Sequence, residues 1–266
     1  MKRAMFSLLA ILLGVGVAAA EPATLVGSCE QGGLVIGLVR PGATVSLDGR
    51  PVMVAPDGRF LLGFGRDAAV QATLVVDGAV QRLTVTPRPW IVQRINGLPQ
   101  AKVTPDPATL ARIQAENARI VQARQRLTSR PHWQGGAVWP AEGPVSGVFG
   151  SQRVLNGTPR APHSGTDIAA PAGSPVVAMA DGAVSLVHPD MVLTGNTVMI
   201  DHGFGLQSVY AHMADILVRE GEPVRKGQVI GHVGATGRAT GPHLHFGVTL
   251  FDGKLDPERV LAVLGG

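Results

Sequence analysis

The sequence predicts a mainly β protein with a small N-terminal β-sandwich, a connecting helix and a C-terminal antiparallel β domain. Three observations lead to this prediction. Residues 23–90 consist of short apolar runs separated by Asp-Gly and Pro-Gly turn signals. Residues 106–128 then repeat apolar side chains at helical spacing. From Trp133 onward, short strand-like runs and frequent glycines return, which is typical of a second β domain.

The beginning of the chain predicts export from the cytoplasm. Lys2 and Arg3 precede an apolar run that ends in Ala18-Ala19-Ala20, so residues 1–20 are interpreted as a secretory signal peptide. The apolar run is short for a bilayer-spanning helix, and we expect no transmembrane segment in the mature chain. The rest of the 266 residues is long enough for two modest domains.

Composition narrows the function classes. The formal net charge is +4 and aromatic residues make up 4% of the chain, so there is no dense basic and aromatic stripe for nucleic-acid binding. A single cysteine, Cys29, excludes an intrachain disulfide. We favour a small buried thiol at this position. Lipidation at Cys29 stays an alternative, although Glu21 and Pro22 stand where a lipobox should directly follow the apolar run.

The first domain, residues 21–90, has no histidine and no clustered carboxylates, which favours a binding or spacer role without chemistry. Residues 91–131 form the linker, with an irregular connection expected over 91–104. A helix over about 106–128 follows, because Asp106 is a good N-cap and Pro107 fits the first helical position. One interpretation of this helix is a connecting helix packed on a neighbouring domain. The other is a regulatory arm across the active-site cleft, so that the full-length protein is less active than a chain beginning near Trp133.

Residues 132–266 contain the motifs that predict chemistry. His243 and His245 lie two residues apart in a glycine-containing run, so an extended strand directs both side chains to one face. His163 and Asp167, about eighty residues earlier, add an imidazole and a carboxylate. Zinc prefers these ligand types, and two histidines, one carboxylate and an open fourth position describe a hydrolytic zinc site.

A third motif, Tyr210-Ala211-His212-Met213, makes the combination more specific. Together, the runs HSGTD, NTVMIDHG, YAHM and GPHLHFGV resemble the lysostaphin-like, LytM-type zinc metallopeptidases, which cut peptidoglycan peptides. The resemblance covers roughly residues 140–258. The residues before this range take no property from it.

The resemblance implies a role for each matching residue. It makes His163, Asp167 and His245 the zinc ligands. It makes His212 and His243 the pair that faces the metal-activated water and the substrate. One histidine of the pair can move the proton and the other can stabilise the oxyanion, and spacing leaves the assignment open.

The remaining candidates receive simpler interpretations. Tyr210 is expected either to hydrogen-bond near the oxyanion or to be an interface aromatic. His202 is expected at a strand end, with a structural role favoured over a place in the cleft. His188 and His232 are expected to be solvated or hydrogen-bonded rather than ligands.

These observations predict a secreted, zinc-dependent endopeptidase that acts on peptidoglycan stem peptides or cross-links, in the periplasm or at the extracellular cell envelope. Its expected partners are peptidoglycan peptides and an envelope regulator. Two alternatives stay open. One is a non-catalytic LytM-like regulator that activates another cell-wall hydrolase, and the other is a scaffold protein that binds wall peptides.

Overall fold

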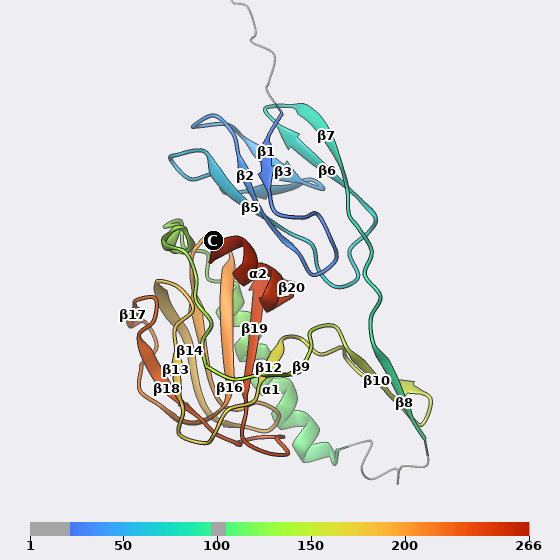
Figure 1. Ribbon diagram of the computed structural model, residues 1–266, viewed down its shortest axis with the longest axis vertical. Helices are drawn as coiled ribbons and strands as arrows, with labels where there is room; N and C mark the ends of the chain where they lie inside the picture. The colour runs from blue at the N-terminus through green and yellow to red at the C-terminus, as the bar shows by residue number, and fades with distance from the viewer. Residues whose placement is uncertain (1–21, 97–104, 266) are drawn as a thin grey trace, which may run out of the picture.

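The computed structural model describes residues 22–96 and 105–265. The predicted signal peptide lies outside these residues, as does most of the connection expected over 91–104. Within the described ranges, neither helix combines the length and the apolar character needed to cross a membrane. The prediction of a mainly β protein built of antiparallel sheets is confirmed (Figure 1).

The N-terminal part consists of two small sheets. The first has the order β1-β2-β5 and the second has the order β4-β3-β6-β7. Their strands are β1 (Thr24–Val26), β2 (Leu34–Leu38), β3 (Val45–Leu47), β4 (Arg50–Val52), β5 (Arg59–Gly63), β6 (Gln71–Val76) and β7 (Ala79–Thr84). Alternate residues of β6 are buried, as expected for a strand with one face on a core. Val35, Phe60 and Leu74 belong to that core.

The turns of these sheets explain why Asp-Gly pairs recur. Asp48 and Asp77 have φ angles of 47° and 49°, and the glycine after each also has a positive φ. Two successive residues in this region form the hairpin turn whose twist matches that of the flanking strands. Aspartate tolerates the conformation and glycine adopts it freely.

The expected irregular connection contains a strand, which corrects the sequence interpretation. β8 (Val92–Ile95) pairs in parallel with β10 (Gln152–Leu155), and β10 pairs with β11 (Thr158–Pro159). Just before β8, Trp90 packs edge-on against Phe149 at 5.8 Å between ring centroids. This segment therefore runs along the C-terminal part of the molecule (Figure 1).

The connecting helix is α1 (Pro107–Arg124), and it ends four residues before the expected end at 128. The Asp106 side chain accepts hydrogen bonds from the backbone N–H groups of Ala108 and Thr109, as an N-cap does. Ile120 and Ala123 pack against apolar side chains of the neighbouring sheet. The helix therefore packs on the neighbouring domain, as one of the two interpretations expects, and the regulatory role stays a hypothesis.

The C-terminal part is built on a ten-stranded sheet whose main path is β17-β14-β15-β16-β19-β12-β9. Its strands are β9 (Val145–Gly147), β12 (Thr166–Ile168), β13 (Pro175–Val177), β14 (Gly182–Met191), β15 (Gly195–Asp201), β16 (Leu206–Ile216), β17 (Pro223–Val224), β18 (Val229–Val233), β19 (Leu244–Leu250) and β20 (Gly253–Leu255). A 3-10 turn, η2 (His132–Gly135), leads into this part, and α2 (Pro257–Leu264) closes it.

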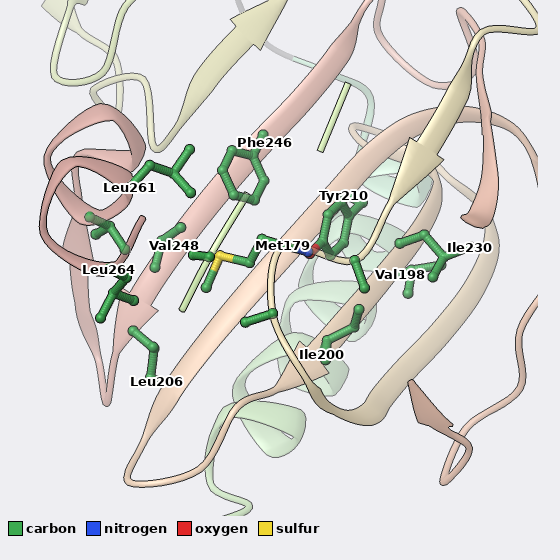
Figure 2. Close-up of a cluster of buried hydrophobic side chains, with 14 of the residues drawn as sticks. Met179, Val198, Ile200, Leu206, Tyr210, Ile230, Phe246, Val248, Leu261 and Leu264 are labelled. Atoms are coloured by element: carbon green, nitrogen blue, oxygen red, sulfur yellow. The ribbon is translucent and has the colours of Figure 1, made fainter. Parts of the chain in front are cut away.

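The two faces of β16 and β19 are covered differently. One face carries Tyr210, Phe246 and Val248, which form the main core with Met179 and the apolar side of α2 (Figure 2). The opposite face carries Val209, which packs against α1. Because side chains alternate along a strand, His245 lies on the same face as α1. The candidate site is therefore on the α1 side of the sheet.

Candidate metal centre and active site

The structure brings His163, Asp167 and His245 together. Asp167 in β12 lies directly opposite His245 in β19, so the ladder directs both side chains to one side. His163 approaches from the loop before β12. His163 Nε2 is 3.1 Å from Asp167 Oδ1 and 3.0 Å from His245 Nδ1, and the last two atoms are 2.8 Å apart.

This donor set fits a zinc ion. Ligand atoms at zinc bond lengths in a tetrahedron are roughly 3.3 Å from one another, close to the three separations above. His163 Nδ1 is 3.0 Å from the carbonyl oxygen of Val148. A carbonyl can only accept, so Nδ1 carries a hydrogen, and when the ring is neutral Nε2 is left with the lone pair that a metal ion needs. The group His163, Asp167 and His245 can therefore hold the metal that the motifs predict.

Electrostatics within the cluster keep Asp167 ionised. Burial by itself raises the pKa of Asp167, but hydrogen bonds from His163 and His245 outweigh burial and hold the pKa well below its ordinary value. Burial lowers the pKa of His245, because a charged ring loses solvation there. For His163, burial opposes protonation, yet the bond to Asp167 prevails and raises the pKa.

His212 reaches the same site through a β-bulge in β16. Val198 pairs with Tyr210 and Asn196 pairs with Met213, so Ala211 and His212 together oppose one residue of β15. Ala211 is also the cross-strand partner of His245. A φ of 61° at His212 turns its side chain to the site although strict alternation directs it to the core. Its ring lies 6.1 Å from that of His245, centroid to centroid.

His243, the residue just before β19, completes the group. Its ring centroid is 4.7 Å from that of His212. Nδ1 of His243 bonds the carbonyl of Gly241 at 2.9 Å, and Nδ1 of His212 bonds the carbonyl of Thr236 at 2.8 Å. Both Nδ1 atoms therefore carry hydrogen in the neutral rings, which leaves each Nε2 as an acceptor. Burial lowers the pKa of His212 to about 4, so that ring is neutral at pH 7.

Tyr210 does not lie near the oxyanion position. It is fully buried on the opposite face of β16, where its hydroxyl accepts from the backbone N–H of Met179 at 2.8 Å (Figure 2). His202 is also buried and bonds the carbonyl of Asp181 and the hydroxyl of Ser208. His188 bonds the carbonyl of the next residue, and His232 pairs with a surface aspartate. These histidines have structural surroundings, as the sequence favoured.

A cavity of about 230 Å³ opens beside the histidine cluster. The residues that line it are Arg66, Asp67, Phe149, Pro162, His163, Asp252 and Lys254. Arg66 and Asp67 come from the N-terminal part, and no motif indicated that these two residues lie near His163. A larger cavity of about 300 Å³ is lined by Trp133 and Lys226 among others, with no histidine in its lining. We therefore associate the smaller cavity with the chemistry.

Comparison with known proteins identifies the family. The model of peptidase family M23 matches residues 161–257, which include all five site residues. A crystal structure described as an M23 peptidase from Pseudomonas aeruginosa is 30% identical, covers 89% of this chain and 96% of its own, and superimposes with a TM-score of 0.64. The chain belongs to peptidase family M23. The resemblance seen in the motifs is thereby confirmed.

Curated relatives match a shorter stretch. The present chain is 46% identical over 105 residues to the peptidoglycan DD-endopeptidase ShyA of Vibrio cholerae. The match covers 38% of this chain and 24% of the relative. The chain is 45% identical over 98 residues to the DD-carboxypeptidase/endopeptidase Mpg of Neisseria meningitidis, covering 37% of this chain and 22% of the relative. The chain thus spans about a quarter of the length of these relatives.

Proposed function

We propose that this protein is a zinc-dependent endopeptidase that hydrolyses peptide bonds of peptidoglycan stem peptides or cross-links at the cell envelope. The observation that carries the proposal is the convergence of His163 Nε2, Asp167 Oδ1 and His245 Nδ1 within about 3 Å of one another. The names of the M23 relatives support the substrate class. The complete set of donors favours an enzyme over a non-catalytic regulator or scaffold.

In this proposal His163, Asp167 and His245 hold the ion. Zinc, when bound, supplies a Lewis acid that polarises the scissile carbonyl and makes water a nucleophile near neutral pH. The ligands are prepared for this task, because Asp167 is ionised and His163 presents a lone pair at Nε2. Burial keeps His245 neutral, as a ligating imidazole must be.

In this proposal His212 and His243 carry out the proton transfers of the reaction. As the water oxygen bonds to the carbonyl carbon, Nε2 of one ring accepts the proton that the water loses. That ring then carries N–H groups at both nitrogens, with Nδ1 still donating to its backbone carbonyl. Its new Nε2–H stabilises the oxyanion or passes the proton to the amine when the C–N bond breaks. The pair can divide these tasks because in both rings a backbone carbonyl holds Nδ1 and leaves Nε2 free to accept the proton.

Substitution of the histidines tests the proposal. We expect His245→Ala and His212→Ala to lower the cleavage rate of purified muropeptides at least about 100-fold, because one loses a ligand and the other a proton carrier. His232→Ala is the matched control, since this histidine pairs with the exposed Asp215 on the surface and should keep wild-type activity. Cleavage is followed by chromatography of the products, with circular dichroism to verify folding. Wild-type rates in both site variants would contradict the assignment.

A further inference from the structure

A row of side chains leads away from the histidine cluster along β19. His245, Gly247 and Thr249 lie on one face because side chains alternate along a strand, and their partners in β16 are Ala211, Val209 and Gln207. On the other side, Thr249 pairs with Lys254 of β20. Residues directly opposite one another share a face, so the ladder places Lys254 at the end of this row.

The C-terminal end of α1 lies over the same place. The Gln207 side chain donates to the carbonyl oxygen of Ala123 at 3.0 Å, and Val209 packs against Ala123. The next residue is Arg124, whose Nε is buried without a hydrogen-bond partner in the described structure. Thr249 Oγ1 is likewise buried and unpartnered there. Two polar groups therefore lack partners at the point where the helix meets the row.

Arg124 and Lys254 are two cations without a counter-ion. Among residues 22–96 and 105–265, neither side chain forms a salt bridge with a carboxylate. Burial lowers the pKa of both, and the charge of Arg124 lowers that of Lys254 further. The ladder places Lys254 opposite Thr249, and Arg124 follows Ala123, whose carbonyl accepts from Gln207 on the other side of Thr249. Partly desolvated like charges are unfavourable unless an anion compensates them.

We propose that Arg124 and Lys254 form a subsite for a carboxylate of the peptide substrate. This inference rests on the proposed peptidase function and adds a determinant of specificity to it. Lys254 and His163 line the same 230 Å³ cavity, so the Lys254 end of the subsite opens beside one of the candidate zinc ligands. Thr249 lies four strand residues from His245, which corresponds to about 13 Å. An extended peptide spans that distance in about four residues.

The subsite selects acidic peptides by two effects. A carboxylate placed between the two cations removes their mutual repulsion and forms charge-assisted hydrogen bonds. An amide at the same position leaves both cations uncompensated. Peptides bearing a free carboxylate about four residues from the cleaved bond are therefore the preferred class, and the carboxylate can be a chain terminus or a side chain.

Calorimetric titration of zinc-loaded protein with matched peptides tests the subsite. The peptides are cross-linked stem peptides that have free carboxylates, an amidated C-terminus or amidated side-chain carboxylates. We expect Arg124→Gln and Lys254→Met to raise the Kd of the free-carboxylate peptide roughly tenfold. The peptide whose amidation abolishes the difference between wild type and variants identifies which carboxylate binds. The KM for cleavage of the same peptide should rise by the same factor. The kcat should stay within about twofold of the wild-type value.

Arg119→Gln is the matched control, because Arg119 lies on the same helix but pairs with Glu220. This variant should bind as wild type does, and thermal melting verifies that each variant folds. Variants that bind all three peptides as wild type does would overturn the subsite. Binding does not require turnover, so a protein that binds selectively but cleaves nothing would contradict the proposed function and leave the subsite standing.

Discussion

Three consecutive residues of β16 show how finely side-chain direction is controlled. Tyr210 points into the core, Ala211 lies on the face that carries His245, and His212 turns to that face as well because the bulge interrupts alternation. The motif alone suggested that Tyr210 could assist the oxyanion. Alternation and a single positive φ of 61° decide otherwise. A rare backbone conformation at a non-glycine residue is often found at a functional position.

His202 makes stability depend on pH. Burial lowers its pKa to about 4, against about 6.5 in an unfolded chain. Between these values the unfolded state binds more protons, so stability falls as the pH falls. We expect the metal-free protein to lose about 2 kcal/mol through His202 between pH 7 and pH 5. Urea unfolding at several pH values measures this loss.

The matched variants for this measurement are His202→Asn and His232→Asn. His202→Asn should be less stable at pH 7, because it disturbs the bonds to Asp181 and Ser208, but its stability should depend less on pH by that amount. His232→Asn affects a histidine at the surface and should retain the wild-type dependence. An unchanged pH dependence in His202→Asn would refute the account.

At the scale of elements, α1 packs on the face of the sheet that carries the candidate site. Ile120 and Ala123 pack on Leu186, Met191, Met199 and Val209. The Glu116 carboxylate accepts from the backbone N–H of Val192 at 2.9 Å, which ties the helix to the β14–β15 hairpin. His212 in turn bonds the carbonyl of Thr194 in that hairpin through its backbone N–H. The helix therefore supports the loop that holds a catalytic candidate.

Substitutions at two adjacent positions of α1 test whether the helix supports the site or lowers the activity of the enzyme. We expect Ile120→Asp to lower the free energy of unfolding by about 2 kcal/mol and to reduce peptidase activity, because a charge is buried against the sheet. Val121→Asp should change either quantity little, since Val121 is 51% exposed. Chemical unfolding and muropeptide cleavage report the two effects. A more active Ile120→Asp protein would instead favour the hypothesis that α1 is a regulatory arm.

Local signals predicted much of the fold. Alternating apolar residues with Asp-Gly turns indicated the strands, and Asp106 with Pro107 indicated the start of α1. β8 was missed because its pairing partner, β10, lies about sixty residues further along the chain. A short strand held mainly by such a distant partner leaves little trace in its own sequence. Likewise, α1 ends at Arg124 through packing and capping that the spacing did not show.

The residues of the candidate site, too, could be predicted only in part. Spacing and motif together suggested the five residues that the structure brings together. Arg66, Lys254 and Arg124 were not singled out, because each reaches the site region from an element without any motif. Arg66 comes from the N-terminal part and lines the cavity beside His163. Only the packing of distant elements reveals such residues.

At the scale of the whole molecule, the N-terminal part is joined firmly to the peptidase part. Leu34 and Leu61 of its first sheet belong to the main hydrophobic core. Arg88 forms a salt bridge of 2.8 Å with the buried Asp256, the N-cap of α2. Arg66 and Asp67 also line the cavity at His163, so residues of both parts line it. We propose that residues 21–90 contribute to substrate binding.

The metal dependence of peptidoglycan cleavage is the most direct test of the central claim. Protein lacking residues 1–20 is incubated with peptidoglycan as zinc-loaded enzyme, with a chelator, and with zinc restored, and the fragments are analysed by mass spectrometry. We expect fragments cut at peptide bonds, which disappear with the chelator and return with zinc. Identical fragments in the chelated sample, or fragments cut only in the glycan, would contradict it.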